Sequence, residues 1–278
     1  SFDSMTPVGT DASGIPTIRV GLRDGYYGVD LSSILFWFDG APVTPAISTE
    51  DGLTTIQYEP GVLSAGSTHS YTVAFADNNS SPLSQTNTFS FTVANYLTLP
   101  AAYAKPAGSA TTPGFTYRTV KAPLGTSELP NTIARAKAQL NLTLIDPNTG
   151  APYENSATPG PNPDGSYDVD TINFEQFGNA AGNLAGDQPF PGLDAADHDS
   201  FSTEALFYLD LPAGYYRFGV NSDDGFEVSV GTLPQDAFAP QTVLGVYDGG
   251  RGPSDTLFDF LAPTAGTYSF RLIYEEGS

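Results

Sequence analysis

Residues 211–231 limit the fold of this chain more than any other stretch, because two alternating apolar runs flank a short acidic turn. Apolar side chains alternate with polar or small ones in Tyr215–Val220 and again in Phe226–Val230. A period of two is typical of β-strands, and the Asn-Ser-Asp-Asp-Gly stretch between the runs is typical of a tight turn. We therefore predict a β-hairpin in which Gly225 provides the positive φ of the turn.

The composition favours short strands joined by many turns. Gly and Pro number 29 and 23, Tyr and Phe are frequent, and 278 residues suffice for two domains with separate cores. The chain contains no cysteine, which excludes disulfides, zinc–thiolate sites and a thiol nucleophile. We expect an all-β protein with two β-sandwich domains joined by a connector that carries one short α-helix.

The charge of the chain excludes nucleic acid as a partner. Ten basic and 31 acidic residues give a formal net charge of -21, which repels polyanions and anionic lipid but attracts cations. No apolar run approaches the ~20 residues that a membrane-spanning helix needs, so we expect no membrane insertion. The chain starts at Ser1 without a Met or an apolar leader, the pattern expected of a mature or excised segment.

Residues 1–97 are predicted to form the first sandwich. Short strand candidates, separated by Asp-Gly and Asn-Asn turns, span residues 17–22, 33–38, 54–58, 70–76 and 87–93. Strands at this spacing are typical of a sandwich. The segments SSILFWFDGAPVT, LSAGSTHSYTVAFAD and NTFSFTV resemble parts of the immunoglobulin-like or fibronectin-III-like repeats of large bacterial surface and secreted proteins. We expect Trp37 to be a core residue and His69 to be an ordinary strand residue.

Residues 98–166 are predicted to connect the two domains. Both ends of this region are rich in Pro, Gly and Asn, which disfavour regular structure. Between these ends, Leu129, Ile133, Ala136 and Leu140 recur at helical spacing, which predicts a helix near residues 129–141. Half of the ten basic residues fall in this region, so we expect it to lie against an acidic domain.

Residues 167–278 are strongly acidic and are predicted to form the second sandwich. Its predicted strands span residues 171–174, 204–211, 215–220, 226–231, 242–246, 255–260 and 267–274. Two segments carry a family resemblance. LPAGYYRFGVNSDDGFEV resembles the core hairpin of PA14-type β-sandwich modules, and FLAPTAGTYSFRLIYEE resembles a later strand of the same modules.

The PA14 resemblance implies a calcium site. In the sugar-binding members an Asp-Asp pair, joined by a cis peptide bond, holds a calcium ion that binds sugar hydroxyls. The resemblance carries this role over to Asp223 and Asp224. Those lectins also use an Asn and backbone carbonyls from a second loop, for which the candidate here is Tyr247–Asp255. That loop contains no Asn, which departs from the family pattern.

The candidate site residues all lie on or beside these two loops. The predicted metal ligands, for Ca²⁺ as the cofactor, are Asp223, Asp224 and Asp248. The predicted ligand-binding residues are Asn221, Tyr247, Arg251 and Asp255. The alternative is that the Asp pair only shapes a turn, with Asp side chains bonded to turn amides. A second acidic stretch is predicted to be a solvated loop and contains Asp194, Asp197, His198 and Asp199.

Catalysis has little support in the sequence. The chain has two distant His residues, no Cys and no G-x-S-x-G motif, so no nucleophilic triad is indicated and we predict a protein that is not an enzyme. We expect an extracellular or cell-surface module of a larger bacterial surface or secreted protein. Its predicted function is adhesion through calcium-assisted binding of a carbohydrate or glycan surface.

A structural role is the alternative prediction. PA14-like modules continue with one more strand after the one predicted here at residues 267–274, whereas this chain stops at residue 278. Either the sequence has been cut short, or another chain completes the sheet. The second sandwich would then lack its last strand and expose an edge beside Phe270, Leu272 and Tyr274. Residues 1–9 of another copy could fill that edge by strand addition, and head-to-tail exchange would build a fibre or surface layer.

Overall fold

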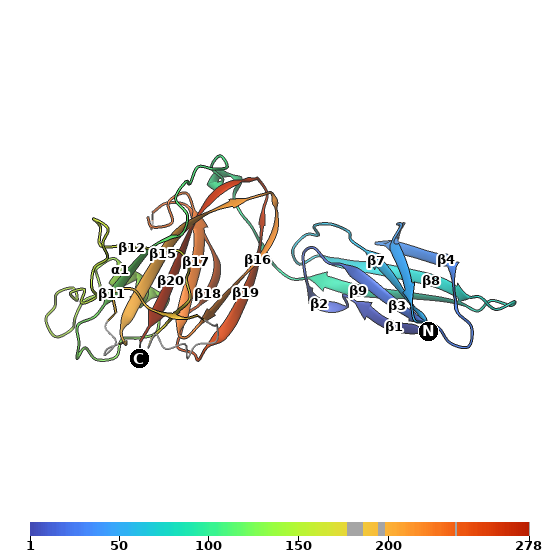
Figure 1. Ribbon diagram of the computed structural model, residues 1–278, viewed down its shortest axis with the longest axis horizontal. Coiled ribbons are helices and arrows are strands. Elements are labelled where there is room, and N and C mark those ends of the chain that lie inside the picture. The colour runs from blue at the N-terminus through green and yellow to red at the C-terminus, as the bar shows by residue number, and fades with distance from the viewer. Residues whose placement is uncertain (177–185, 194–197, 237, 278) are drawn as a thin grey trace. The chain divides into compact units, whose positions relative to one another are not determined.

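The computed structural model describes residues 1–176, 186–193, 198–236 and 238–277 (Figure 1). The chain separates into two compact units, Ser1–Leu97 and Thr98–Ser278. Both are built from β-sheets, which confirms the predicted all-β class. The helices of the described residues are η1 (Ala101–Tyr103), a 3₁₀ turn, and α1 (Ile133–Leu140). Neither helix has the length and apolar character needed to cross a lipid bilayer. Asp194 and Asp197 lie outside the described residues.

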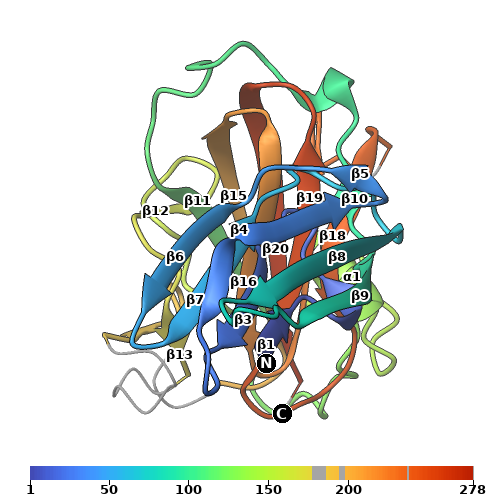
Figure 2. The same ribbon diagram turned by 90° about the vertical axis from the view of Figure 1, so that its right-hand side faces the viewer.

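The first unit is a sandwich of two sheets (Figure 2). One sheet has the strand order β1 (Phe2–Thr6), β3 (Ile18–Arg23), β7 (Leu53–Tyr58) and β6 (Ala46–Glu50). The other has the order β2 (Gly9–Ala12), β9 (Ser84–Val93), β8 (Thr68–Asp77), β4 (Val29–Phe38) and β5 (Ala41–Pro42). Its core includes the fully buried Ile18, Ile56 and Tyr71. The immunoglobulin-like assignment of this unit stays a prediction.

Two aromatic residues of the first unit differ in their surroundings. Trp37 is half-buried and lies outside the core cluster, since its neighbours Phe36 and Phe38 point into the core and strand alternation turns Trp37 outward. The prediction of Trp37 as a core residue was therefore wrong.

His69 is held by the Asp39 carboxylate, 2.7 Å from Nδ1, and by the Ser67 hydroxyl, 2.7 Å from Nε2. These contacts fix the His69 ring on its strand.

The second unit is dominated by a six-stranded sheet. Its order is β12 (Tyr167–Val169), β11 (Phe115–Lys121), β15 (Phe201–Leu211), β20 (Gly266–Glu276), β17 (Gly225–Gly231) and β18 (Gln241–Tyr247). A three-stranded sheet has the order β10 (Leu97–Thr98), β19 (Ser254–Ala262) and β16 (Gly214–Ser222). A short parallel pair joins β13 (Phe174–Glu175) and β14 (Gln188–Pro189). Fully buried Phe226, Phe260 and Phe270 belong to the core between the two larger sheets.

The region predicted to be a connector is part of the second unit. β11 lies between β12 and β15 in the large sheet, and α1 packs against β15 and β20. Val120, Ala136, Leu140 and Ile273 form a buried cluster that joins the helix to this sheet. The helix begins at Ile133 rather than near residue 129, because the Thr132 side chain accepts a hydrogen bond from the backbone N–H of Arg135 and caps it. Residues 98–166 are therefore not a separate connector.

The predicted open edge does not exist. β20 is paired along its length with β15 on one side and with β17 on the other, so Phe270, Leu272 and Tyr274 lie in the middle of the sheet. The N-terminal segment is also engaged, since β1 pairs with β3 and Phe2 packs against Phe75 with 5.4 Å between ring centroids. The strand-exchange alternative was wrong in both its acceptor edge and its free donor.

The predicted hairpin is a crossing between sheets. β16 pairs with β19 in the three-stranded sheet, whereas β17 pairs with β18 and β20 in the six-stranded sheet. The φ of Gly225 is not in the left-handed region. A Cβ on Gly225 would lie 2.9 Å from the Tyr247 carbonyl oxygen and still closer to the Glu275 carboxylate. Glycine is needed at residue 225 because two other segments approach its backbone closely.

Candidate functional site

The crossing from β16 to β17 consists of Asp223 and Asp224, and the peptide bond between them is cis. Asp223 is exposed, whereas Asp224 is 6% exposed. Since β17 is buried over its whole length, the crossing places Asp224 against the interior and leaves Asp223 at the surface. The two predicted metal ligands therefore lie together at one end of the second unit.

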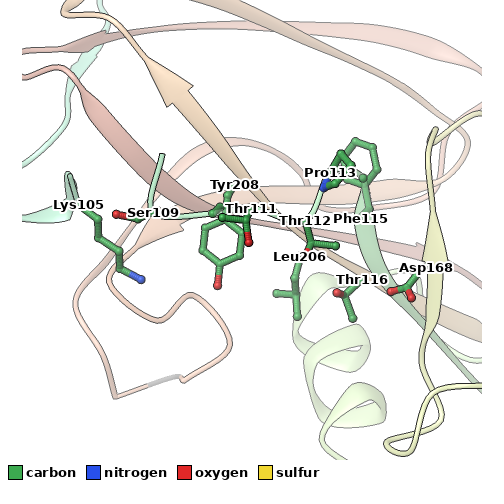
Figure 3. A pocket seen from close by; sticks show the side chains of 12 residues that line it. Lys105, Ser109, Thr111, Thr112, Pro113, Phe115, Thr116, Asp168, Leu206 and Tyr208 are labelled. Carbon is green, nitrogen blue, oxygen red and sulfur yellow. The ribbon is translucent and has the colours of Figure 1, made fainter. Parts of the chain in front are cut away.

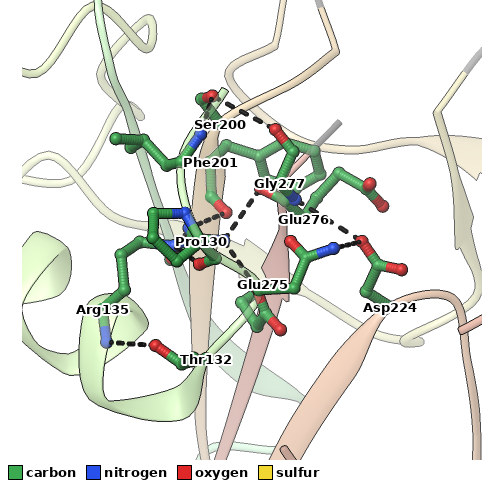
Figure 4. A network of polar contacts seen from close by, with 12 residues as sticks. Pro130, Thr132, Arg135, Ser200, Phe201, Asp224, Glu275, Glu276 and Gly277 are labelled. Carbon is green, nitrogen blue, oxygen red and sulfur yellow. Dashed lines mark hydrogen bonds and ion pairs between the residues drawn. The ribbon is translucent and has the colours of Figure 1, made fainter. Parts of the chain in front are cut away.

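Asp224 is held by three segments that are distant in sequence, and Figure 4 shows its contact with Gly277. Its Oδ2 accepts a hydrogen bond from the Asn131 side-chain amide at 2.7 Å, and the Gly277 amide lies 3.5 Å from the same oxygen. Its Oδ1 accepts a hydrogen bond from the Arg251 backbone amide at 2.9 Å. Donors from these three segments fix the position of the Asp224 carboxylate.

Glu276 adds a third carboxylate to the pair. One carboxylate oxygen from each of Asp223, Asp224 and Glu276 lies within 4.8 Å of the others. Glu276 is 3% exposed, and its Oε2 accepts a hydrogen bond from the Tyr274 hydroxyl at 2.8 Å. The Tyr274 hydroxyl also bonds to the Asp223 backbone carbonyl oxygen, which ties β20 to the crossing. Glu276 is a candidate ligand that the sequence analysis missed.

The three carboxylates are electrostatically unfavourable neighbours. Burial is the largest of the effects that raise the pKa of Glu276 to about 9; nearby Asp224 and Asp223 add to it, and the Tyr274 hydrogen bond opposes it. Burial, followed by the charge of Asp224, raises the pKa of Asp223. A divalent cation would compensate such charges. Hard carboxylate oxygens are the ligands that Ca²⁺ and Mg²⁺ prefer, so the donor set fits the ion implied by the PA14 resemblance.

Asp248, the third predicted metal ligand, lies outside this carboxylate group. Its Oδ1 accepts a hydrogen bond from the Ile133 backbone amide at 2.7 Å, at the first residue of α1. A carboxylate at the N-terminus of a helix is stabilised by the exposed amides there. The structure thus gives Asp248 a role in docking α1 next to the site.

The predicted ligand-binding residues fall into two pairs. Asn221 faces Asp255 across β16 and β19, and its side-chain amide donates to the Asp255 carboxylate at 2.7 Å. Arg251 lies over the Tyr247 ring, with 4.3 Å from the guanidinium carbon to the ring centroid. Arg251 also donates to the Ser222 carbonyl and hydroxyl and to the Thr256 hydroxyl. The Arg251 guanidinium therefore fixes Ser222, the residue that precedes the crossing.

A cavity of about 420 Å³ adjoins Asp223. Asn221, Ser222 and Asp223 line it from the β16 side, and Phe226 and Tyr274 line it from the six-stranded sheet. Small-molecule sites commonly have volumes of about 300–1,000 Å³ and combine apolar walls with a few polar groups. The exposed Asp223 carboxylate therefore faces space that can hold a small ligand.

An Asn from the segment before α1 lies beside the Asp pair. Asn131 contacts Asp224, although 93 residues separate them in sequence. The Asn131 side-chain oxygen is buried and has no hydrogen-bond donor among the described residues. An unmatched buried acceptor next to three carboxylates fits a nearby cation or water molecule. The only sequence signal for Asn131 was its position ahead of a helix.

A buried ion pair between α1 and β20 lies next to the site (Figure 4). Arg135 in α1 contacts the Glu275 carboxylate at 2.5 Å and donates to the Glu276 backbone carbonyl at 3.0 Å. Burial raises the pKa of Glu275 to about 7, against the lowering effect of the Arg135 charge. This pair holds the end of β20, and with it Glu276, against α1.

Comparisons with known proteins found likenesses in solved structures alone. No family model and no curated protein matches the chain. Similar structures include the PA14 domain of the MpAFP antifreeze protein, 17% identical, with a TM-score of 0.38 over 62% of this chain and 82% of that chain. A PA14 sugar-binding domain from an RTX adhesin is 18% identical, with a TM-score of 0.36 over 60% of this chain and 85% of that chain. With identities this low, these likenesses carry no information on the ligand of this chain.

Proposed function

We propose that the second unit binds a carbohydrate through a calcium ion held by Asp223, Asp224 and Glu276. It acts as an adhesion module and catalyses no reaction. The observation that supports this proposal is the convergence of the three carboxylates within 4.8 Å, with the exposed Asp223 facing a cavity of about 420 Å³.

Each carboxylate has a distinct part in this proposal. Asp224 is fixed by Asn131 and by the Arg251 backbone, so it presents a preformed ligand. Glu276 is held by Tyr274, and Asp223 supplies the negative charge at the surface. Calcium takes six to eight oxygen ligands, so these three residues leave positions for backbone oxygens, water or a ligand. A bound calcium ion would supply coordination for two neighbouring sugar hydroxyls.

The cavity walls suit the remaining surface of a sugar. Asn221 lines the cavity with a polar side chain, and the partly exposed Tyr274 offers aromatic surface within it. Sugar rings have apolar faces that pack on aromatic side chains, while their hydroxyls need polar partners. The PA14 resemblance of residues 211–228 and 260–276 supports the same ligand class.

The proposed setting is the cell surface or the extracellular medium, as part of a larger surface or secreted protein. Extracellular calcium modules commonly bind the ion with Kd values of about 10⁻⁴–10⁻³ M. A site with one carboxylate exposed and few protein ligands fits that range. The absence of cysteine is compatible with this setting, because units of this size do not need disulfides for stability.

Calorimetric calcium titration and a glycan array with either calcium or EGTA test the proposal. We expect calcium to raise the melting temperature of the second unit and to be required for glycan binding at this site, since an ion bound only to the folded state stabilises it. Asp223→Asn should abolish both effects. The matched control is Asp51→Asn, an exposed Asp in the first unit. Equal melting of the unaltered protein in calcium and in EGTA would show that no calcium site exists.

A further inference from the structure

A trough on the outer face of the six-stranded sheet contains an unusual combination of side chains (Figure 3). In β15, Ala205 and Phe207 point into core clusters, so strand alternation directs Leu206 and Tyr208 to the opposite face. Thr116 of β11 lies directly opposite Leu206 on one side and Asp168 of β12 on the other. The floor of the trough therefore crosses three adjacent strands.

The trough lies toward the end of the sheet away from the carboxylates. Along β15 and β20, Phe201 faces Glu276 at the carboxylate end, whereas Tyr208 faces Ser269 seven residues further along. Strands rise about 3.3 Å per residue, so the two places are roughly 20 Å apart. The trough and the carboxylate site share no lining residue.

The wall of the trough is residues 105–114, and both of its ends are fixed. Lys105 and Thr267 exchange backbone hydrogen bonds at 3.0 and 2.9 Å, and the Gly108 amide donates to the Asp210 carboxylate at 3.1 Å. At the other end Gly114 has a φ of 89°, and a Cβ there would lie 2.7 Å from the Val169 carbonyl oxygen. These contacts hold open a volume of about 280 Å³ between the wall and the sheet.

The side chains in the trough combine one exposed aromatic ring with hydroxyls and two opposite charges. Tyr208 is 52% exposed, and the Lys105 ammonium lies 5.6 Å from its ring centroid. Figure 3 shows Lys105 at one end, Asp168 at the other, and Thr111 and Thr116 between them. Within the part of the chain that the structure describes, no carboxylate forms an ion pair with Lys105. Its remaining hydrogen-bonding capacity is available to a ligand.

We propose that this trough is a second saccharide-binding site, which takes one or two rings of a neutral sugar chain and needs no calcium. The apolar face of a pyranose ring would stack on Tyr208. Its hydroxyls would accept from Lys105, donate to Asp168 and exchange hydrogen bonds with the Thr hydroxyls. Hydrogen bonds to charged groups are roughly twice as strong as neutral ones, so both ends of the trough favour a polar, uncharged ligand.

Other ligand classes fit the trough less well. An apolar ligand would remove water from the hydroxyls and charges without replacing their hydrogen bonds, which costs free energy. A polyanion would be repelled by a chain with a net charge of -21. The volume of about 280 Å³ lies at the low end of the range for small-molecule sites, which limits the bound part of the ligand to one or two rings.

Saccharide-observed NMR in EGTA tests this proposal with the whole chain. The probes are neutral gluco-, manno- and galacto-configured trisaccharides, with a uronic acid trisaccharide for comparison. We expect at least one neutral probe to bind in EGTA. Tyr208→Ala should weaken that binding tenfold or more, whereas Tyr208→Phe should retain it because the stacking surface is kept. Tyr26→Ala, which removes a tyrosine that is 95% exposed in the first unit, is the matched control.

Two further results separate this site from the carboxylate site. Asp223→Asn should leave binding in EGTA unchanged, so a failure of the calcium proposal would not affect the outcome. Unchanged melting of Tyr208→Ala would show that the variant is folded. The proposal is overturned if no neutral probe binds in EGTA, if only the uronic acid probe binds, or if Tyr208→Ala binds as tightly as the unaltered chain.

Discussion

Arg135 in α1 and Glu275 near the end of β20 form an ion pair with 2.5 Å between nitrogen and oxygen, and their side chains are 3% and 0% exposed. Arg135 also donates to Gln139, Ser202 and the Phe201 carbonyl. Nearly all of its donors are therefore matched inside the protein. The pair joins α1 to β20, the strand that ends at the carboxylate site. The sequence analysis had placed this helix in a separate connector.

Arg135→Met should lower the free energy of unfolding of the second unit by about 3–5 kcal/mol, because it leaves Glu275 buried without its counter-charge. Urea denaturation monitored by far-UV circular dichroism measures this loss. The double variant Arg135→Met/Glu275→Leu should recover part of it, since no unpaired charge is then left in the interior. A loss below about 0.5 kcal/mol in the single variant would contradict a structural role for the pair.

The strands of both units were largely predictable from sequence, but their partners were not. The runs Tyr215–Val220 and Phe226–Val230 are strands as predicted, because period-two alternation reports a local property of the backbone. Alternation does not say whether two successive strands pair or cross between sheets. β20 likewise matches its predicted position, yet its place at the centre of the sheet depends on β15 and β17.

The part of the candidate site whose residues are adjacent in sequence was predictable. The part whose residues come together only in the folded chain was not. Asp223 and Asp224 stand next to each other in a recognisable motif. Asn131 reaches Asp224 across 93 residues, and Arg135 reaches Glu275 across 140. Glu276 follows a strand whose pattern predicted an exposed edge, so nothing in the sequence placed it beside the Asp pair. Long-range packing decides these contacts.

Gly225→Ala should destabilise the second unit by about 1–3 kcal/mol, as expected for an added methyl group in a packed interior. The added Cβ would meet the Tyr247 carbonyl oxygen and the Glu275 carboxylate. Gly252→Ala is the control, since a Cβ at residue 252 would have no atom within 4 Å. Thermal unfolding of the two variants shows whether glycine is needed at residue 225 because other segments pack closely against its backbone, or because a turn requires a positive φ there. Equal melting temperatures would show that the backbone at Gly225 is not closely packed.

The Arg217–Asp259 pair should give a small stability contribution that depends on pH. The two residues face each other across β16 and β19 with hydrogen bonds of 2.7 and 2.7 Å. The hydrogen bond from Arg217, against the raising effect of burial, lowers the pKa of the Asp259 carboxyl below its ordinary value of 3.8. A lowered pKa in the folded state stabilises the fold above the unfolded-state pKa, and this contribution is lost as pH falls below about 4.

The variant Asp259→Asn tests the predicted direction of this pH dependence. Arg217 is half exposed, so we expect the variant to be less stable at pH 7 by about 0.5–1 kcal/mol only. Urea midpoints measured from pH 7 to pH 2.5 should show the difference between the two proteins shrinking below about pH 4. A difference that stays constant or grows on acidification would mean that the carboxylate charge is not the source of the effect.

Glu276→Gln should weaken calcium binding by about tenfold or more, because calcium affinity in oxygen sites falls as charged ligands are removed. The Gln side chain keeps the size of Glu and can still accept a hydrogen bond from Tyr274, so the fold around the site should persist. Asp248→Asn is the matched control, since an Asn oxygen can still accept from the Ile133 amide at the start of α1. Calcium titration calorimetry should show near-normal affinity for Asp248→Asn. Reversed results, with Asp248→Asn losing calcium and Glu276→Gln retaining it, would assign the third ligand to the β18–β19 loop instead of the end of β20.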